Sequence, residues 1–183
     1  MTESKPAKPK IEDFINELLD GEARANALDF VAWLRGKKMG ISATSNGNSW
    51  KATFKGKTVC RILQMRKDWW CVENYPYVVL QKNDILTAKI EKLIVEEDMR
   101  DVIWTYMTAN KCRRCVPKSC AKIAGENPDS FTGFTVDLFG RKFNDLCKYN
   151  AYFYNPDTRA VECMKKICVL KKQNITDNAS RAT

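Results

Sequence analysis

Cysteine is the residue type whose spacing in this chain points most directly to chemistry. Cys112, Cys115 and Cys120 lie close together, and Cys147 follows after 26 intervening residues. Four thiolates complete a tetrahedral zinc shell, and the C-x-x-C spacing directs two sulfur atoms to one point. We therefore expect a structural zinc site formed by these four cysteines. Zinc suits a closed sulfur shell without a redox partner, whereas an iron–sulfur cluster is the less favoured alternative.

A redox function is open to the same cluster. Cys112 and Cys115 have the spacing of a thiol–disulfide oxidoreductase pair, so this activity is the alternative to a metal site. Arg113, Arg114 and Lys118 lie between the thiols and favour thiolate formation in both cases. These three cationic residues are also candidate anion-binding residues.

The other thiols have different expected roles. Cys163 lies at the margin of the apolar stripe of the last predicted helix and is an alternative fourth ligand. Cys168 lies on that stripe, and Cys60 and Cys71 fall in predicted strands. A free cysteine in such positions packs as a small hydrophobic residue, so we expect these three to be buried.

Histidine is absent from the 183 residues, which excludes His-based catalytic triads and His-ligated metal sites. The sequence also contains no phosphate-binding glycine loop. Both observations favour a non-enzymatic function. The formal net charge of +9 favours an acidic partner or nucleic acid.

Aromatic and basic residues are interleaved in the first half of the chain. The aromatic residues are Trp50, Phe54, Trp69 and Trp70, and the basic ones are Lys51, Lys55, Lys57, Arg66 and Lys67. Such a pattern is found in stacking surfaces for single-stranded nucleic acid and also in ordinary half-buried strands. A basic nucleic-acid-binding module is therefore the third hypothesis.

Apolar residues at helical spacing predict helices near residues 11–19 and 27–34, with Gly21 ending the first and Gly36 capping the second. Two-residue alternation and turn residues then predict an antiparallel meander. Its strands are expected at 41–44, 50–54, 59–65 and 69–72, with a hairpin turn at Asn46–Gly47.

The second half of the chain is expected to begin with a helix at about 96–109 that leads into Cys112. Strands follow at 134–139, 143–147 and 152–154, and the first two would form a hairpin that returns Cys147 to the cluster. A last helix is expected after Asn155 as N-cap and Pro156 as its first residue. Residues 1–10 and 173–183 are polar and are expected to be disordered tails.

The C-terminal segment resembles a cysteine-rich segment of several uncharacterised bacterial proteins. The matching residues are the cysteine cluster, Phe139-Gly140-Arg141-Lys142-Phe143, Asn144-Asp145-Leu146-Cys147 and Phe153-Tyr154-Asn155-Pro156-Asp157 followed by Glu162-Cys163. This resemblance implies that Cys147 belongs with the cluster. The region from Ala27 to Val72 is similar in layout to YdhG-like or DUF3788-type α+β domains, and neither resemblance implies an activity.

Together these patterns predict an α+β protein with N-terminal helices on an antiparallel meander. Residues 11–110 are the expected α+β domain, and 111–172 the expected cysteine-stapled hairpin and helix packed on it. No apolar stretch precedes Lys10, so we expect neither a signal peptide nor a membrane span, and a cytoplasmic location. The leading hypothesis is a cytoplasmic binding or sensing module with a structural zinc site.

Overall fold

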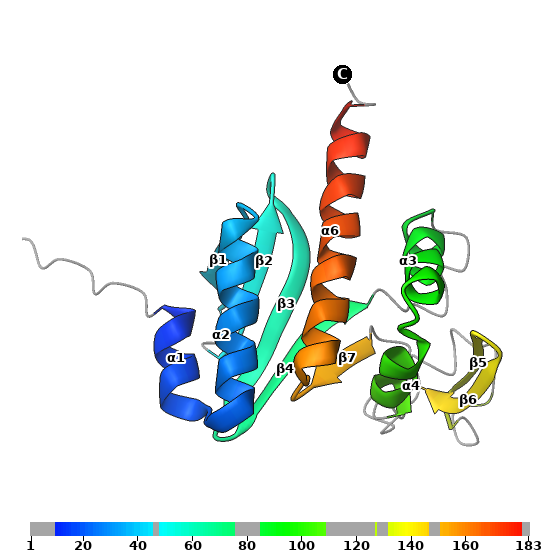
Figure 1. Ribbon diagram of the computed structural model, residues 1–183, viewed down its shortest axis with the longest axis horizontal. Coiled ribbons are helices and arrows are strands. Elements are labelled where there is room, and N and C mark those ends of the chain that lie inside the picture. The colour runs from blue at the N-terminus through cyan, green and yellow to red at the C-terminus, as the bar shows by residue number, and fades with distance from the viewer. Residues whose placement is uncertain are drawn as a thin grey trace, which may run out of the picture.

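The computed structural model describes residues 10–45, 48–75, 85–108, 127, 132–146 and 151–180. They form the predicted α+β fold, in which N-terminal helices pack on an antiparallel sheet (Figure 1). The helices are α1 (Ile11–Leu18), α2 (Gly21–Gly36), α3 (Ile85–Glu96), α4 (Arg100–Thr108) and α6 (Thr158–Ser180). The strands are β1 (Gly40–Ala43), β2 (Trp50–Phe54), β3 (Lys57–Arg66), β4 (Trp69–Tyr75), β5 (Phe134–Leu138), β6 (Arg141–Leu146) and β7 (Ala151–Tyr154).

The main sheet has the strand order β1-β2-β3-β4-β7, and all of its neighbours are antiparallel. The first four strands are consecutive in the sequence and form the predicted meander. The last strand, β7, pairs with β4 after a long excursion of the chain. A residue pair such as Val72 and Phe153 therefore lies side by side although the two are far apart in sequence.

The two faces of the sheet have different side chains, because successive residues of a strand point to opposite sides. One row across all five strands is apolar, and it is buried except at Ala43, which is partly buried: Ala43, Trp50, Ile62, Val72 and Phe153. The adjacent row on the other face is mostly polar: Ser42, Lys51, Arg61, Glu73 and Tyr152. This alternation directs the apolar row toward the helices.

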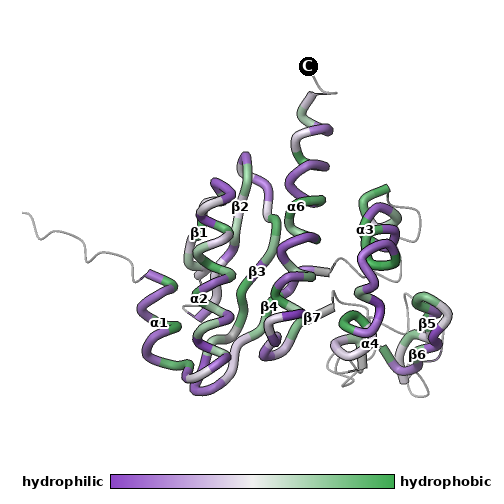
Figure 2. Tube along the Cα trace, viewed as in Figure 1, coloured by the Kyte–Doolittle hydropathy of each residue, from purple (hydrophilic) through white to green (hydrophobic). Residues whose placement is uncertain are grey.

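Helices α1, α2 and α6 pack on the apolar face of the sheet (Figure 1). Their own sequences alternate between hydrophobic and hydrophilic residues, as Figure 2 shows along α2 and α6. Phe30 of α2 contacts Trp70 of β4, with ring centroids 6.4 Å apart. The buried side of α6 consists of Ala160, Val161, Cys163, Met164, Ile167 and Cys168. Full burial of a large apolar side chain stabilises the fold by about 1.5–3 kcal/mol, so this interface supplies much of the stability.

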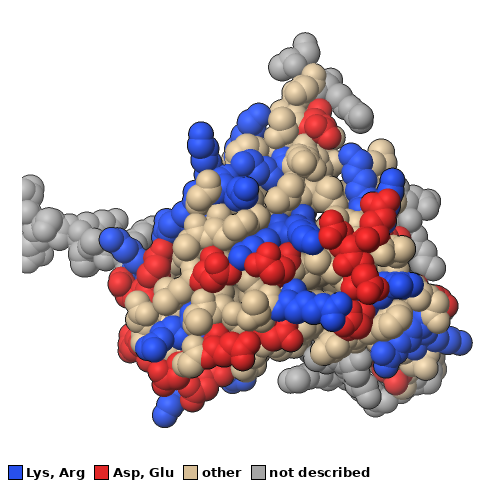
Figure 3. Space-filling view, viewed as in Figure 1, with Lys and Arg blue, Asp and Glu red and all other residues tan. Residues whose placement is uncertain are grey.

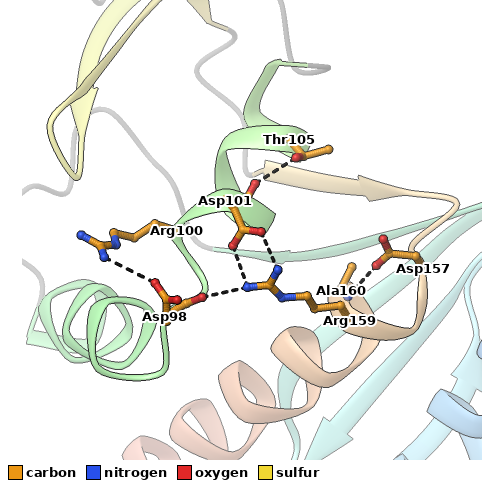
Figure 4. Close-up of polar contacts among 7 residues, drawn as sticks. All are labelled: Asp98, Arg100, Asp101, Thr105, Asp157, Arg159 and Ala160. Carbon is orange, nitrogen blue, oxygen red and sulfur yellow. Dashed lines mark hydrogen bonds and ion pairs between the residues drawn. The ribbon is translucent and has the colours of Figure 1, made fainter.

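Two elements from the middle of the chain lie beside this core. Helix α3 packs against α6, and α4 packs against β7 and β6. Arg159 at the start of α6 holds α4 through two hydrogen bonds to Asp101, of 2.7 and 3.0 Å, and a third to the carbonyl oxygen of Asp98 (Figure 4). Because both charged side chains are about half exposed, this bidentate pair serves to orient α4 more than to stabilise the fold.

The prediction of a helix at 96–109 is wrong about where the helix begins. Glu96 ends α3, and Asp98 has a φ of 49°, so the chain turns before α4 begins at Arg100. The acidic residues 96–98 were expected at a helix N-terminus and instead lie at the end of α3 and in this turn. Glu97 pairs there with Lys166 of α6, with 2.6 Å between Nζ and Oε2.

The C-terminal tail expected at 173–183 is helical as far as Ser180. Ile175 packs against the core, and Lys89 of α3 forms an ion pair with Asp177, at 3.9 Å between Nζ and Oδ2. Tertiary contacts therefore extend α6 through a segment whose local composition favours disorder. The expected tail at 1–10 lies outside the described residues except for Lys10, as do the hairpin turn 46–47 and residues 76–84.

The N-cap of α6 also differs from the prediction. The side chain of Asp157, and not that of Asn155, accepts a hydrogen bond from the backbone N–H of Ala160 at 2.8 Å. Asn155 has a φ of 41° and instead accepts a hydrogen bond from the backbone N–H of Trp70 at 2.8 Å. Both side chains satisfy backbone groups, but only Asp157 caps the helix.

Replacement of Asp157 by Ala should lower the free energy of unfolding by about 1 kcal/mol, because the first turn of α6 loses its cap. Urea unfolding followed by circular dichroism measures the change. Asp157→Asn is the matched control, since it keeps a capping oxygen and should recover most of the loss. Equal stability of Asp157→Ala and the wild-type protein would show that the hydrogen bond to Ala160 does not stabilise α6.

Candidate functional site

The four predicted zinc ligands, Cys112, Cys115, Cys120 and Cys147, lie outside the described residues. So do the candidate anion-binding residues Arg113, Arg114 and Lys118. Within the described ranges, no group of three or more potential metal ligands comes together. The zinc, iron–sulfur, redox and anion-binding hypotheses for this segment therefore stay predictions.

The elements that lead to these cysteines are described, and they contact each other. Helix α4 ends at Thr108, four residues before Cys112, and β6 ends at Leu146, immediately before Cys147. Strands β5 and β6 form the predicted hairpin. The indole N–H of Trp104 in α4 donates to the carbonyl oxygen of Leu138 at 3.0 Å, and α4 also packs on β6.

The open end of this hairpin is closely packed. Gly133 has a φ of 143°, and a Cβ atom at this position would overlap the backbone of Asp145. Leu146 is buried, and its strand β6 packs against α4. The strand that leads to Cys147 is thus held by backbone packing on one side and by α4 on another.

Cys163, the alternative fourth ligand, lies on the buried side of α6 and is fully inaccessible to solvent. Burial raises the pKa of its thiol to about 12, and the nearby cation Lys166 acts in the opposite direction. This environment favours a neutral core thiol over a thiolate ligand.

Cys60, Cys71 and Cys168 are buried, as predicted. Burial raises the pKa of Cys71. The pKa of Cys60 is raised well above its usual range, first by its hydrogen bond with Cys168 and then by burial. Cys60 of β3 and Cys168 of α6 therefore form a thiol pair where the helix contacts the sheet.

A polar cluster surrounds this thiol pair. The Cys168 thiol donates to the side-chain oxygen of Asn74 at 3.6 Å, and the Asn74 amide donates to the carbonyl oxygen of Met164 at 2.8 Å. Lys171, one turn further along α6, donates to the carbonyl oxygen of Val59 at 3.0 Å and also to that of Asn74. Burial lowers the pKa of Lys171, although the thiols and Glu73 act in the opposite direction.

A cavity of about 320 Å³ adjoins the cluster. It is lined by Thr58, Val59, Cys60, Arg61, Glu73, Asn74 and Lys171. Lys171 belongs to none of the sequence patterns that predicted a site. A signal was present, because residue 171 is three or four positions after Ile167 and Cys168 and continues the apolar stripe of α6.

A larger cavity, of about 730 Å³, lies beside α1 and β1. Its wall contains Arg35, which donates two hydrogen bonds, of 2.7 and 3.1 Å, to the Glu12 carboxylate. That hydrogen bond with Arg35 lowers the pKa of Glu12. Arg35 and Glu12 thus neutralise each other, whereas Lys171 in the smaller cavity is bonded to uncharged carbonyl oxygens.

The predicted aromatic surface is only partly present. Trp50 and Trp70 are buried in the core, so they are unavailable for stacking on a ligand. Trp69 points to the opposite face, as the alternation predicts, and is partly exposed. There the Arg66 guanidinium lies 4.6 Å from the centroid of the Trp69 ring, and the Tyr154 ring follows at 5.7 Å.

Positive charge does not gather into one patch on the face of the molecule that Figure 3 presents. Lysine and arginine are interspersed there with aspartate and glutamate. Lys165, for example, contacts both Asp29 and Glu162 at 2.6 Å.

Comparison of the chain with protein-family models, with curated proteins and with solved structures finds no match. The resemblances drawn from sequence motifs thus stay predictions. In the described part of the chain, none of the helices has the length and apolar character needed to cross a membrane.

The four described cysteines should resist alkylation in the native protein at pH 8, because their thiols are buried and the reagent cannot reach them. Iodoacetamide labelling followed by peptide mass mapping measures this. Cys60, Cys71, Cys163 and Cys168 should stay unlabelled in buffer and become labelled in urea. Rapid labelling of any of them without urea would contradict the burial described above.

Proposed function

We propose that this chain is a cytoplasmic binding or sensing module in which Cys112, Cys115, Cys120 and Cys147 bind one structural zinc ion. The observation that carries the proposal is the contact between α4 and the β5–β6 hairpin. These two elements precede the two parts of the cysteine set. Since they are packed together, the chain needs only a short path from each to bring the sulfur atoms to one point.

The packing of Gly133 against Asp145 adds support, because it restrains the strand from which Cys147 follows. A restrained strand loses little conformational entropy when its next residue binds a metal ion. The absence of histidine leaves sulfur and carboxylate as metal ligands, and a sulfur shell favours zinc. The role of the zinc ion would then be structural, because it would hold the hairpin and the segment after α4 together.

Protein purified without added metal or chelator should contain about one zinc ion per chain, with zinc–sulfur distances of about 2.3 Å. Elemental analysis and X-ray absorption spectroscopy measure the two quantities. Replacement of Cys112 or Cys147 by Ser should abolish zinc binding and unfold the C-terminal segment. Cys60→Ser and Cys163→Ser are the controls that should retain zinc.

The oxidoreductase alternative predicts a different result. A closed zinc shell leaves no free nucleophile, so alkylation of Cys112 and Cys115 should be slow until a chelator is added. A zinc-free protein with an intact fold and a reversible Cys112–Cys115 disulfide would overturn the zinc proposal. Turnover of a model disulfide by that protein would support the oxidoreductase hypothesis.

A nucleic-acid-binding function is the second candidate, and the arrangement around Trp69 favours it. Trp69, Tyr154 and Tyr152 follow one another on the face of the sheet opposite α2 and α6, with ring centroids 5.7 and 5.9 Å apart. Arg66 lies over Trp69, and Arg61 and Lys51 extend the row across the sheet. Aromatic rings combined with cations are typical of surfaces that bind single strands.

We expect this surface to bind single-stranded nucleic acid weakly, with an affinity that falls steeply as salt rises. Fluorescence anisotropy with an oligonucleotide at low and near-physiological salt measures it. Trp69→Ala should reduce the binding several-fold, whereas replacement of the buried Trp50 tests only stability. Tight binding at physiological salt that is lost on replacing Arg113 and Arg114 would instead identify the cysteine segment as the nucleic-acid-binding element.

A further inference from the structure

Strands β3 and β4 separate at one end, and Lys171 occupies the separation. The two strands pair as far as Arg61 and Glu73. Beyond that point β3 continues beside β2, while β4 continues beside β7. We call this place the strand fork: residues 58–61 of β3 and 73–74 of β4. The Nζ atom of Lys171 bridges the fork, because it donates to Val59 on one strand and to Asn74 on the other.

The hydrogen bonds of Lys171 match those of a neutral amine. An ammonium group has three N–H donors, whereas an amine has two and a lone pair. Val59 and Asn74 supply two carbonyl acceptors, and the described residues provide no third oxygen acceptor and no carboxylate in ion-pair contact with Nζ. The thiols of Cys60 and Cys168, which also act on the pKa of Lys171, are weak acceptors.

The site is accessible to a small molecule. The fork residues and Lys171 line the cavity of about 320 Å³, which is the size of cavities that hold small ligands. Its lining is mainly polar and includes the residues Thr58, Arg61 and Glu73. Arg61 and Glu73 are 3.7 Å apart, and Arg61 is the more exposed of the two.

We propose that Lys171 is a nucleophilic amine that binds small anionic aldehydes or ketones, such as 2-oxo acids, as a reversible imine at the strand fork. Arg61 would bind the anionic group of the ligand, since a guanidinium pairs with a carboxylate through two hydrogen bonds. Burial supports the nucleophile by lowering the pKa of Lys171, which increases the fraction of neutral amine at neutral pH.

The covalent step balances without an oxidant or a reductant. The lone pair of the Lys171 nitrogen forms a bond to the carbonyl carbon, and the carbonyl oxygen takes up a proton. This oxygen then leaves as water. The two hydrogens of the water come, in net terms, from the amine, and a double bond remains between the carbon and the Lys171 nitrogen. The Glu73 carboxylate can relay protons between nitrogen and oxygen. The imine nitrogen can then take up a proton from solvent, and the resulting N–H can donate to one of the two fork carbonyls.

The inference goes beyond the proposed zinc centre and does not depend on it, because the test is read at Lys171 whether or not zinc is bound. Full-length protein is treated at pH 7 with glyoxylate and cyanoborohydride, which reduces imines to stable amines. Peptide mass mapping then gives the rate of modification at each lysine. We expect Lys171 to react several-fold faster than Lys172, because burial lowers the pKa of Lys171 and the cavity at the strand fork admits the aldehyde.

Lys172 is the matched internal control. It is the next residue of α6, and its Nζ donates to the carbonyl oxygen of Lys37 at 2.7 Å and lies over the Phe54 ring. A rate at Lys171 no higher than that at Lys172, in protein with a native circular dichroism spectrum, would overturn the proposal and leave Lys171 a structural bridge.

A separate variant tests the role of Arg61. Arg61→Gln should lower the modification of Lys171 by glyoxylate about tenfold and leave its modification by neutral acetaldehyde unchanged. This exposed substitution keeps Lys171 and the apolar core, so the variant should fold. Equal rates with glyoxylate in the variant and the wild-type protein would overturn the assignment of an anionic ligand.

Discussion

The burial of α6 against the centre of the sheet is the constraint on which the other features depend. This helix is the last element of the chain, yet its residues Val161, Met164 and Ile167 complete the core that α2 and strands β3 and β4 begin. Without it, the apolar row that runs across the sheet would be exposed beside α2. The residues before β7 and α6 thus cannot reach their final packing until the end of the chain has joined the sheet.

Polar groups within the same interface give it a defined register. Asn26 of α2 donates to the carbonyl oxygen of Pro156 at 3.1 Å, and Asn74 of β4 donates to that of Met164. Both amides are buried, and a buried amide without a partner costs about 1–3 kcal/mol. A shift of α6 along the sheet would break these hydrogen bonds. Apolar burial thus supplies most of the stability, and the two asparagines select one position of the helix.

Local patterns predicted the meander and the N-terminal helices because the interactions that form them are close in sequence. Trp69 and Trp70 lie on opposite faces for a similarly local reason, since successive residues of a strand alternate. The pairing of β7 with β4 was not predictable in this way, since nothing within Tyr152–Tyr154 specifies a partner some eighty residues earlier. The helical state of residues 173–180 likewise depends on contacts with α3 and not on composition.

The candidate sites differ in how much of them a sequence reveals. A cysteine cluster can be recognised in the amino-acid sequence, since metal ligands act through their residue type and spacing. The role of Lys171 cannot be predicted in this way, because its properties come from two backbone carbonyls that belong to different strands. Its position on the apolar stripe of α6 gives a partial signal: a lysine there must either reach solvent or lose hydration. The strand fork decides between these outcomes, because it supplies carbonyl oxygens within reach of Nζ and leaves the amine buried beside a cavity.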